Sequence, residues 1–117
     1  ARSLKGNRLK GIPMPVVALV RFPLTDGIDL DEAKEKFLSS TGRYCGTAGI
    51  VRKHYLITRD RKFGGAVYVF EDQAAADRVH DEAWVTQIKE RYGVEPQVEY
   101  LDNPVIVDNE KGEVLTY

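Results

Sequence analysis

The sequence predicts an α+β domain of the ferredoxin-like class, with the element order β-α-β-β-α-β and an antiparallel four-stranded sheet. Three observations predict it. Residues 48–72 contain two strand-forming arms on either side of a charged turn, the pattern of a long β-hairpin. A nearly continuous apolar run and then a helical pattern precede the hairpin. A second helical stretch and another strand follow it. In this arrangement both helices cover one face of the sheet.

The first strand is expected over residues 15–22, PVVALVRF, and its apolar run predicts a central strand that is covered on both faces. The first helix is expected over residues 29–40. Asp29 begins it and Glu32 follows three residues later, which is the spacing of a capping box. Apolar residues then recur at helical spacing, and Gly42 is expected to end the helix.

The hairpin is expected to have its first arm at residues 50–57, its turn at residues 59–62 and its second arm at residues 66–70. Side chains alternate between the two faces of a strand. In the first arm, this alternation places Ile50, Arg52, His54 and Leu56 on one face and Val51, Lys53, Tyr55 and Ile57 on the other.

Two helical pieces are expected after the hairpin. Asp72 caps the first, which runs towards Ala83, and the second covers residues 84–92 with Gly93 as its C-cap. The remaining strand-like segments are residues 96–101, 105–107 and 113–117.

The chain divides into a flexible basic leader, residues 1–13, and one domain, residues 14–117. Residues 1–12 contain four Lys and Arg residues and no acid. The alternative is a basic arm that binds nucleic acid, but the segment is short and has no interleaved aromatic residues.

Composition narrows the function classes. The chain has 117 residues and a net charge of -1, which gives no argument for nucleic acid or an anionic membrane as partner. No apolar run approaches the roughly 18–20 residues that span a bilayer. Cys45 is the one cysteine, so an intrachain disulfide is impossible, which fits a reducing, cytoplasmic compartment.

A four-stranded sheet with both helices on one face leaves its other face open. Because that face is apolar here, it would form a large exposed patch in a monomer. A second copy of the same sheet can cover it in a closed two-fold dimer. The sequence therefore predicts a homodimer.

Three segments carry a resemblance to a known family: Gly49–Lys53, Gly64–Glu71 and Asp102–Asn109. In this element order they resemble the YdhR-like branch of the dimeric α+β barrel superfamily, over residues 15–109. That branch is described as monooxygenases and is similar to antibiotic-biosynthesis monooxygenases. The resemblance implies a homodimeric α+β barrel with one pocket per subunit between sheet and helices. It leaves the reaction open, because the superfamily contains several activities.

The candidate catalytic residues are His54, Arg52 and Lys53. A histidine on an apolar strand can act as a general base towards a phenolic proton, or bind haem iron. The alternative is a structural or interface histidine. An inward-pointing Arg52 or Lys53 could hold a phenolate, a carboxylate or an enolate, or form a salt bridge in the dimer interface. Arg21 has the same two readings.

The candidate substrate-binding residues are Tyr68, Phe70, Trp84 and Tyr44, because flat rings suit a planar aromatic substrate. Ordinary core packing is the alternative for each ring. Cys45 has no feature that would activate its thiol. His80 is expected to be solvated among acidic residues on a helix, and no metal site is expected.

The leading functional hypothesis is a cofactor-independent oxygenase, or related enzyme, that acts on a small planar phenol or quinol and needs no metal or flavin. One alternative is a haem-binding or haem-degrading protein with His54 as the axial ligand. Another is a non-catalytic dimer that binds a small apolar ligand.

Overall fold

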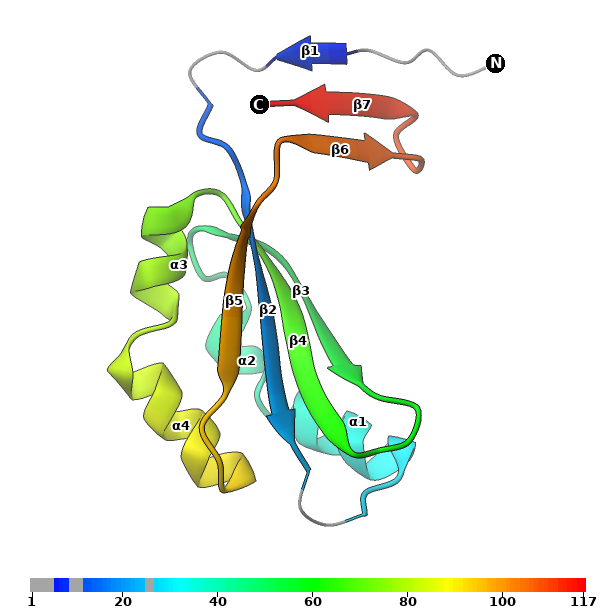
Figure 1. The fold of residues 1–117 in the computed structure, drawn as a ribbon, viewed down its shortest axis with the longest axis vertical. Helices are drawn as coiled ribbons and strands as arrows, with labels where there is room; N and C mark the ends of the chain where they lie inside the picture. The colour runs from blue at the N-terminus through cyan, green and yellow to red at the C-terminus, as the bar shows by residue number, and fades with distance from the viewer. Residues whose placement is uncertain (1–5, 9–11, 25–26) are drawn as a thin grey trace.

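The main body of the protein is a four-stranded antiparallel sheet with the strand order β3-β4-β2-β5 (Figure 1). The computed structural model describes residues 6–8, 12–24 and 27–117. The four strands are β2 (Val16–Pro23), β3 (Ile50–Ile57), β4 (Phe63–Phe70) and β5 (Gln97–Asp102). This strand order and the antiparallel pairing are those of the ferredoxin-like fold, so the predicted fold class is confirmed.

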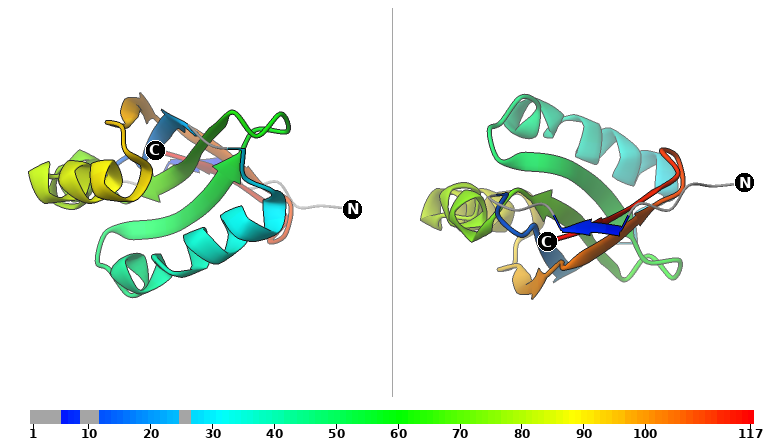
Figure 2. Two further views of the ribbon diagram at one scale, coloured as in Figure 1. Left: turned by 90° about the horizontal axis from the view of Figure 1, so that it is seen from below. Right: turned by 90° about the horizontal axis from the view of Figure 1, so that it is seen from above.

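Four helices accompany the sheet: α1 (Leu30–Leu38), α2 (Thr41–Tyr44), α3 (Gln73–Val79) and α4 (Glu82–Tyr92). In the end-on views of Figure 2, α1 lies beside β3, and α3 and α4 form a second row nearer β2 and β5. As the sequence predicts, Asp29 caps α1 by accepting a hydrogen bond from the Glu32 amide at 2.8 Å. None of the described helices is long and apolar enough to cross a bilayer.

Three helix boundaries differ from the sequence-based expectation. The helix α3 ends at Val79 and does not run on towards Ala83. Gly42 does not end α1, which stops at Leu38, but lies inside the short helix α2. The helical piece expected at residue 84 begins at Glu82, because the Asp81 carboxylate accepts a hydrogen bond from the Trp84 amide at 2.8 Å. Trp84 therefore lies in the first turn of α4 and not at the junction of two helices.

The core lies between the sheet and the helices. Alternate residues of β2 are buried on the helix side, among them Val20 and Phe22. The three largest fully buried side chains are Tyr68, Phe70 and Trp84. Their mutual packing joins β4 to α4. Tyr68 also lines the cavity that the next subsection describes.

The opposite face of the sheet is open. Leu19 of β2 is 38% exposed and Arg21 is also exposed, so within one chain β2 is covered on one face only. The expectation that β2 is covered on both faces is therefore wrong for the single chain. The physical reason is that both rows of helices pack on the same side.

The hairpin of β3 and β4 contains a β-bulge between Ile50 and Arg52. The bulge adds a residue to β3 and breaks the alternation there, so Ile50 packs against the core on the helix side. The face predicted for Ile50 is therefore wrong. Beyond the bulge the predicted alternation holds, with Lys53 and Tyr55 half-buried and Arg52 and His54 exposed.

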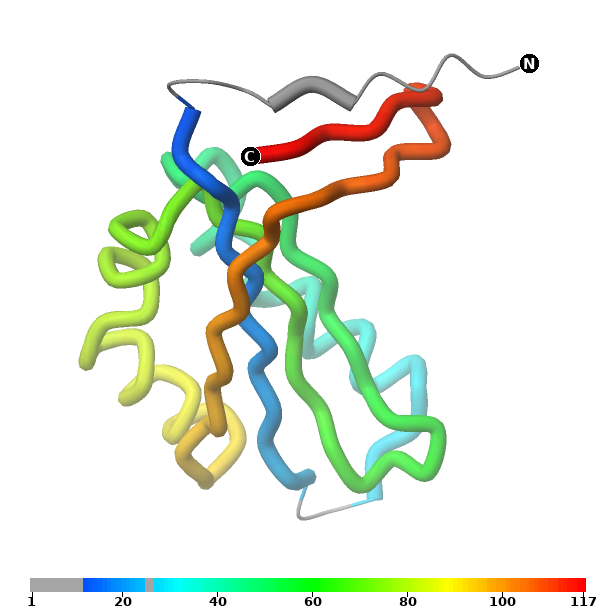
Figure 3. The backbone as a smooth tube through the Cα atoms, turned by 45° about the horizontal axis from the view of Figure 1, so that its top comes forward, coloured from blue at the N-terminus to red at the C-terminus, as the bar shows by residue number. Residues whose placement is uncertain are grey.

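The chain ends form a second, smaller sheet with the order β1-β7-β6. Its strands are β1 (Gly6–Arg8), β6 (Val105–Asp108) and β7 (Glu113–Thr116). Figures 1 and 3 show β6 and β7 running across one end of the main sheet. Of the leader predicted at residues 1–13, Gly6–Arg8 pairs with β7, and residues 1–5 and 9–11 lie outside the described residues.

Candidate functional site

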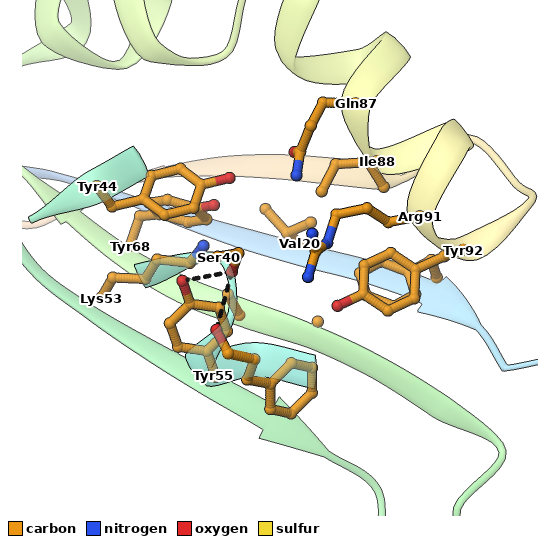
Figure 4. Close-up of a pocket in the computed structure, with 14 residues that line it drawn as sticks. Val20, Ser40, Tyr44, Lys53, Tyr55, Tyr68, Gln87, Ile88, Arg91 and Tyr92 are labelled. Carbon is orange, nitrogen blue, oxygen red and sulfur yellow. Dashed lines mark hydrogen bonds between the residues drawn. The ribbon is translucent and has the colours of Figure 1, made fainter. Parts of the chain in front are cut away.

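A narrow cavity lies between the sheet and helices α1 and α4 (Figure 4). Its lining consists of Val20, Phe22, Phe37, Ser40, Tyr44, Lys53, Tyr55, Gly65, Ala66, Tyr68, Gln87, Ile88, Arg91 and Tyr92. The space open to water-sized molecules is ≈ 20 Å³, which holds about one water molecule. The lining thus combines apolar walls and aromatic rings with two basic groups, and it contains no carboxylate.

Lys53 is the polar centre of this cavity. It projects from β3 on the helix side, and its Nζ lies 3.3 Å from the ring centroid of Tyr44, 4.0 Å from that of Tyr55 and 4.6 Å from that of Tyr68. The described residues form one salt bridge, between Lys89 and Glu95, so no described carboxylate pairs with Lys53. The Lys53 amine is therefore surrounded by ring faces.

The surroundings of Lys53 favour its neutral form. Burial, and then the positive charges of Arg43 and Arg91, lower the pKa of Lys53 from 10.5 to about 7. Burial likewise raises the pKa of Tyr55 and of Tyr68, so both phenols stay protonated near neutral pH. Among these groups, Lys53 is the one that can accept a proton near neutral pH.

Hydrogen bonds hold the rings in place. Ser40 Oγ donates to the Phe37 carbonyl at 3.0 Å, so its contact of 2.9 Å with the Tyr55 hydroxyl is one in which Tyr55 donates. On the other side, the Trp84 indole N–H donates to the Tyr44 hydroxyl at 3.1 Å, in a buried position. These bonds fix the ring planes that face Lys53.

His80 is half-buried against the rings of Tyr68 and Trp84, so the expectation that it is solvated is wrong. Its ring stacks on Trp84 with a centroid distance of 3.9 Å and hydrogen-bonds through Nδ1 to the Tyr100 hydroxyl at 2.9 Å. Burial, and then the charge of Lys53, lower the pKa of His80 from 6.5 to about 4. His80 is the C-cap of α3, and the break between α3 and α4 leaves its ring against Tyr68 of β4 and Tyr100 of β5. A helical wheel of a continuous helix does not predict that break.

Arg91 and Tyr92 line both this cavity and an outer hollow of ≈ 410 Å³ beside Leu24 and Lys36. Arg91 Nη2 donates to the Lys36 carbonyl at 2.9 Å and to Ser39 Oγ at 2.5 Å. Arg91 Nε and Gln87 Oε1 are buried without a hydrogen-bond partner among the described residues. These two atoms could bind a polar group of a ligand.

The structure brings together some of the predicted site residues and separates others. Lys53, Tyr44 and Tyr68 line the cavity. Phe70 and Trp84 are buried in the core next to Tyr68.

Arg52 and His54 lie on the open face of the sheet, away from the cavity. Arg21 lies on that face too, with its guanidinium 3.9 Å from the ring centroid of Phe63.

Sequence reasoning missed Tyr55, Ser40, Gln87 and Arg91 as lining residues. Tyr55 could have been found, because it shares a strand face with Lys53 and lies two residues away. Gln87 and Arg91 lie one helical turn apart, but that spacing is common on solvated helix faces, so it carries no specific signal.

Cys45 is exposed and lies in a shallow outer groove that Lys53, Tyr44 and Tyr55 also line. Lys53 is thus reached from two sides, through the cavity and through this groove. In the described part of the chain, no three His, Cys, Asp or Glu side chains gather as metal ligands.

No family model matches the sequence, and no curated protein matches it. Several solved structures match the fold. SnoaB from Streptomyces nogalater, a cofactor-independent oxygenase solved as a point mutant, has a TM-score of 0.61 and 16% identity, with 81% of this chain and 98% of that chain covered.

A monooxygenase from the gene ActVA-Orf6 of Streptomyces coelicolor, in complex with the ligand Nanaomycin D, has a TM-score of 0.60 and 15% identity, with 81% of this chain and 92% of that chain covered. The heme-degrading protein Rv3592 from Mycobacterium tuberculosis has a TM-score of 0.56 and 15% identity, with 83% of this chain and 99% of that chain covered. Another similar structure belongs to a protein of unknown function from Nitrosomonas europaea.

At these identities the likeness concerns the fold. It agrees with the strand order, the helix positions and the resemblance seen in the sequence. The chain thus has the ferredoxin-like fold that these solved structures share.

Proposed function

We propose that this protein is a cofactor-independent monooxygenase that acts on a small planar phenol or quinol in the cavity around Lys53. The observation that carries the proposal is the lining itself: an amine with a pKa of about 7 among three tyrosine rings, with a second cation and no carboxylate. Such a lining favours an aromatic anion over an aromatic cation. The fold likeness to two monooxygenases, one of them cofactor-independent, supports the same reaction class.

In this mechanism, the Lys53 amine removes the phenolic proton, and the ammonium that forms holds the phenolate by charge. Arg91 is the second positive charge near the developing anion. The electron-rich ring then gives an electron to dioxygen, and the two radicals combine at a ring carbon. Loss of water leaves a quinone, so one oxygen atom enters the product and the other leaves as water. All four electrons come from the substrate, and no reductant is needed.

The cavity must widen to admit such a ligand, because its free space is ≈ 20 Å³. Arg91 and Tyr92 separate it from the outer hollow, so a rotation of these two side chains would join the spaces. Tyr92 is held by stacking on Phe22, with a centroid distance of 4.1 Å, and by the Lys36 ammonium, 4.6 Å from its ring centroid.

The homodimer predicted from the sequence belongs to this proposal. The open sheet face exposes Leu19, Leu56 and Leu101, and a second sheet packed on it would bury them. His54 and Arg52 would then lie at or near the interface between the two sheets. The role predicted for His54 as base remains a prediction, and it would need a ligand space between the two sheets.

Oxygen uptake with a panel of hydroxynaphthalenes and anthrone-type phenols tests the proposal. We expect aerobic turnover that a metal chelator leaves unchanged, and at least a roughly hundredfold loss in Lys53→Met. His54→Ala is the matched control, because it changes the next residue of the same strand on the opposite face. A loss in His54→Ala with full activity in Lys53→Met would contradict the assignment of Lys53 as base.

Haem binding is the second candidate, and the likeness to a heme-degrading protein favours it. No histidine lines the cavity, so an axial ligand would have to be His54 on the open face. A Soret band that forms on adding hemin and disappears in His54→Ala would support this candidate. Tight binding of a phenol without oxygen uptake would instead support the non-catalytic alternative.

A further inference from the structure

Lys53 has the setting of a nucleophilic amine. Its Nζ faces the rings of Tyr44, Tyr55 and Tyr68, and no described carboxylate pairs with it. A lysine in a salt bridge stays protonated and unreactive towards carbonyl groups. A lysine that has lost its water shell and has no anionic partner is the type that reacts with them.

The amine is also within reach of a solute. Lys53 is half-buried, and it lines the outer groove next to Cys45 as well as the inner cavity. A planar aldehyde can enter the groove and place its carbonyl carbon near Nζ, with its ring against the tyrosine side chains. The groove is open towards solvent, so this approach does not require the inner cavity to widen.

We infer that Lys53 is a Schiff-base lysine, which forms an imine with aromatic aldehydes or ketones that enter between the rings of Tyr44 and Tyr55. The inference goes beyond the proposed oxygenation and does not rest on it, since an imine forms whether or not dioxygen reacts. It assigns to this site a second ligand class, planar carbonyl compounds.

Imine formation at Lys53 needs neither an oxidant nor a reductant. The lone pair on Nζ attacks the carbonyl carbon, and the carbonyl oxygen takes up a proton to give a carbinolamine. The hydroxyl then leaves as water as the nitrogen lone pair forms the C=N bond. The Tyr55 hydroxyl, which donates to Ser40, is the nearby acid that can assist this departure.

The groups that set the charge of Lys53 come from every element around it. They are Arg43 and Tyr44 of α2, Tyr55 of β3, Tyr68 of β4, His80 after α3 and Arg91 of α4. The burial of Nζ disfavours the ammonium form, and the two arginines act in the same direction. Burial also raises the pKa of Tyr55 and of Tyr68, so these two phenols add no negative charge that would oppose the effect.

Reductive trapping tests the inference on the full chain. The protein is incubated at pH 7 with 2-hydroxy-1-naphthaldehyde, borohydride is added to convert imines into stable secondary amines, and the labelled peptides are identified by mass spectrometry. We expect Lys53 to be labelled at least about tenfold faster than exposed lysines such as Lys34 and Lys111, because its amine is desolvated and has no anionic partner. The α-amino group is also partly neutral at this pH, and its peptide is mapped separately.

Three controls make the result decisive. Lys53→Arg removes the nucleophile but keeps a cation, so the selective label should disappear. Cys45→Ser, in the same groove, should leave the label unchanged, since the thiol has no role in the imine. Unfolding in urea should abolish the selectivity, because it depends on the folded environment.

Labelling of Lys53 at the rate of Lys34 would overturn the inference and would mean that the ring faces keep the amine protonated. Selectivity that persists in urea would also overturn it. Because oxygen uptake is measured separately, failure of trapping and failure of oxygenation are distinguishable.

Discussion

The titration of Lys53 couples the candidate site to stability. Its pKa is about 7 in the folded protein and 10.5 as the ordinary value, so between these values the unfolded chain binds more protons. The stability that this difference provides is full above pH 10.5. It falls as the pH drops below 10.5 and is lost once the pH has fallen through about 7.

From this we predict that Lys53→Met raises the free energy of unfolding at pH 7 by about 1–3 kcal/mol and flattens its rise between pH 7 and pH 10. Urea denaturation at several pH values measures both effects. Lys34→Met, at an exposed site on α1, is the matched control and should keep the slope. An unchanged slope in Lys53→Met would show that Lys53 stays charged in the folded protein.

His80 gives the corresponding effect in acid. Its folded pKa is about 4 against an ordinary value of 6.5. The stability that this difference provides is full above pH 6.5 and is lost as the pH falls through about 4.

We predict that unfolding free energy falls by about 1–2 kcal/mol between pH 6.5 and pH 4 because of His80, after allowance for solvent screening. In His80→Gln this part of the pH dependence should be missing. His54→Gln, at an exposed site, provides the comparison. The same acid slope in both variants would contradict the assignment to His80.

The Tyr44–Trp84 hydrogen bond is the buried polar contact between α2 and α4. Tyr44→Phe leaves the indole N–H of Trp84 without its acceptor, and we expect a loss of about 1–3 kcal/mol in stability. The double variant with Trp84→Phe should lose less than the sum of the two single variants, because the orphaned donor is then gone. Strict additivity in urea denaturation would show that the bond contributes nothing.

At the scale of elements, the close approach of β2 and β4 depends on Gly65. A Cβ at this position would meet the carbonyl oxygen of Val20, a backbone atom that cannot move aside. We predict that Gly65→Ala lowers stability by at least about 2 kcal/mol.

Gly42→Ala is the control for this effect. Gly42 lies in α2 with nothing near its Cβ position, so alanine there should be neutral or stabilise by up to about 1 kcal/mol. Thermal denaturation compares the two variants. Equal melting temperatures for the two variants would contradict the close strand approach.

The sequence predicts the elements well and the site less well, for physical reasons. The Asp29 and Gly93 caps and the strand alternation of β3 after its bulge are local signals, and the structure confirms them. The bulge at Ile50 and the start of α4 at Glu82 depend on a strand partner and on a cap that short-range patterns do not reveal.

The cavity joins residues from α1, α2, α4 and three strands, and only the packed fold brings them together. Lys53 illustrates this. Its residue type and face are readable from the chain. Its pKa depends first on burial and then on Arg43 and Arg91, which lie on two different helices. The half-buried position of His80 likewise follows from the turn between α3 and α4.

At the scale of the whole molecule, the chain is more extended than a compact domain. Its radius of gyration is 16.1 Å, against about 13 Å expected for this length. The sheet of β1, β6 and β7 lies beyond one end of the main sheet and lengthens the molecule along its longest axis (Figure 1), and Val105 and Val107 in it are exposed. Together with the open sheet face, this shape fits a subunit that completes its packing on a second copy.

We predict that sedimentation gives twice the 13.2 kDa mass of the chain, and that Leu19→Asp on the open face shifts the protein to monomer. Leu30→Asp is the matched control, because Leu30 is also exposed but lies on α1, on the helix side of the sheet. A stable monomer in the wild type at micromolar concentration would contradict the dimer.

Trp84 is the sole tryptophan of the sequence, so the intrinsic fluorescence of the protein reports on this one position. Its indole stacks on the imidazole of His80, and its N–H donates a hydrogen bond to the hydroxyl of Tyr44, which lines the cavity. A charged imidazole at that distance quenches indole emission, so acidification should dim the fluorescence before the chain unfolds. An occupant near Tyr44 should alter the same emission, which gives a label-free readout for screening compounds.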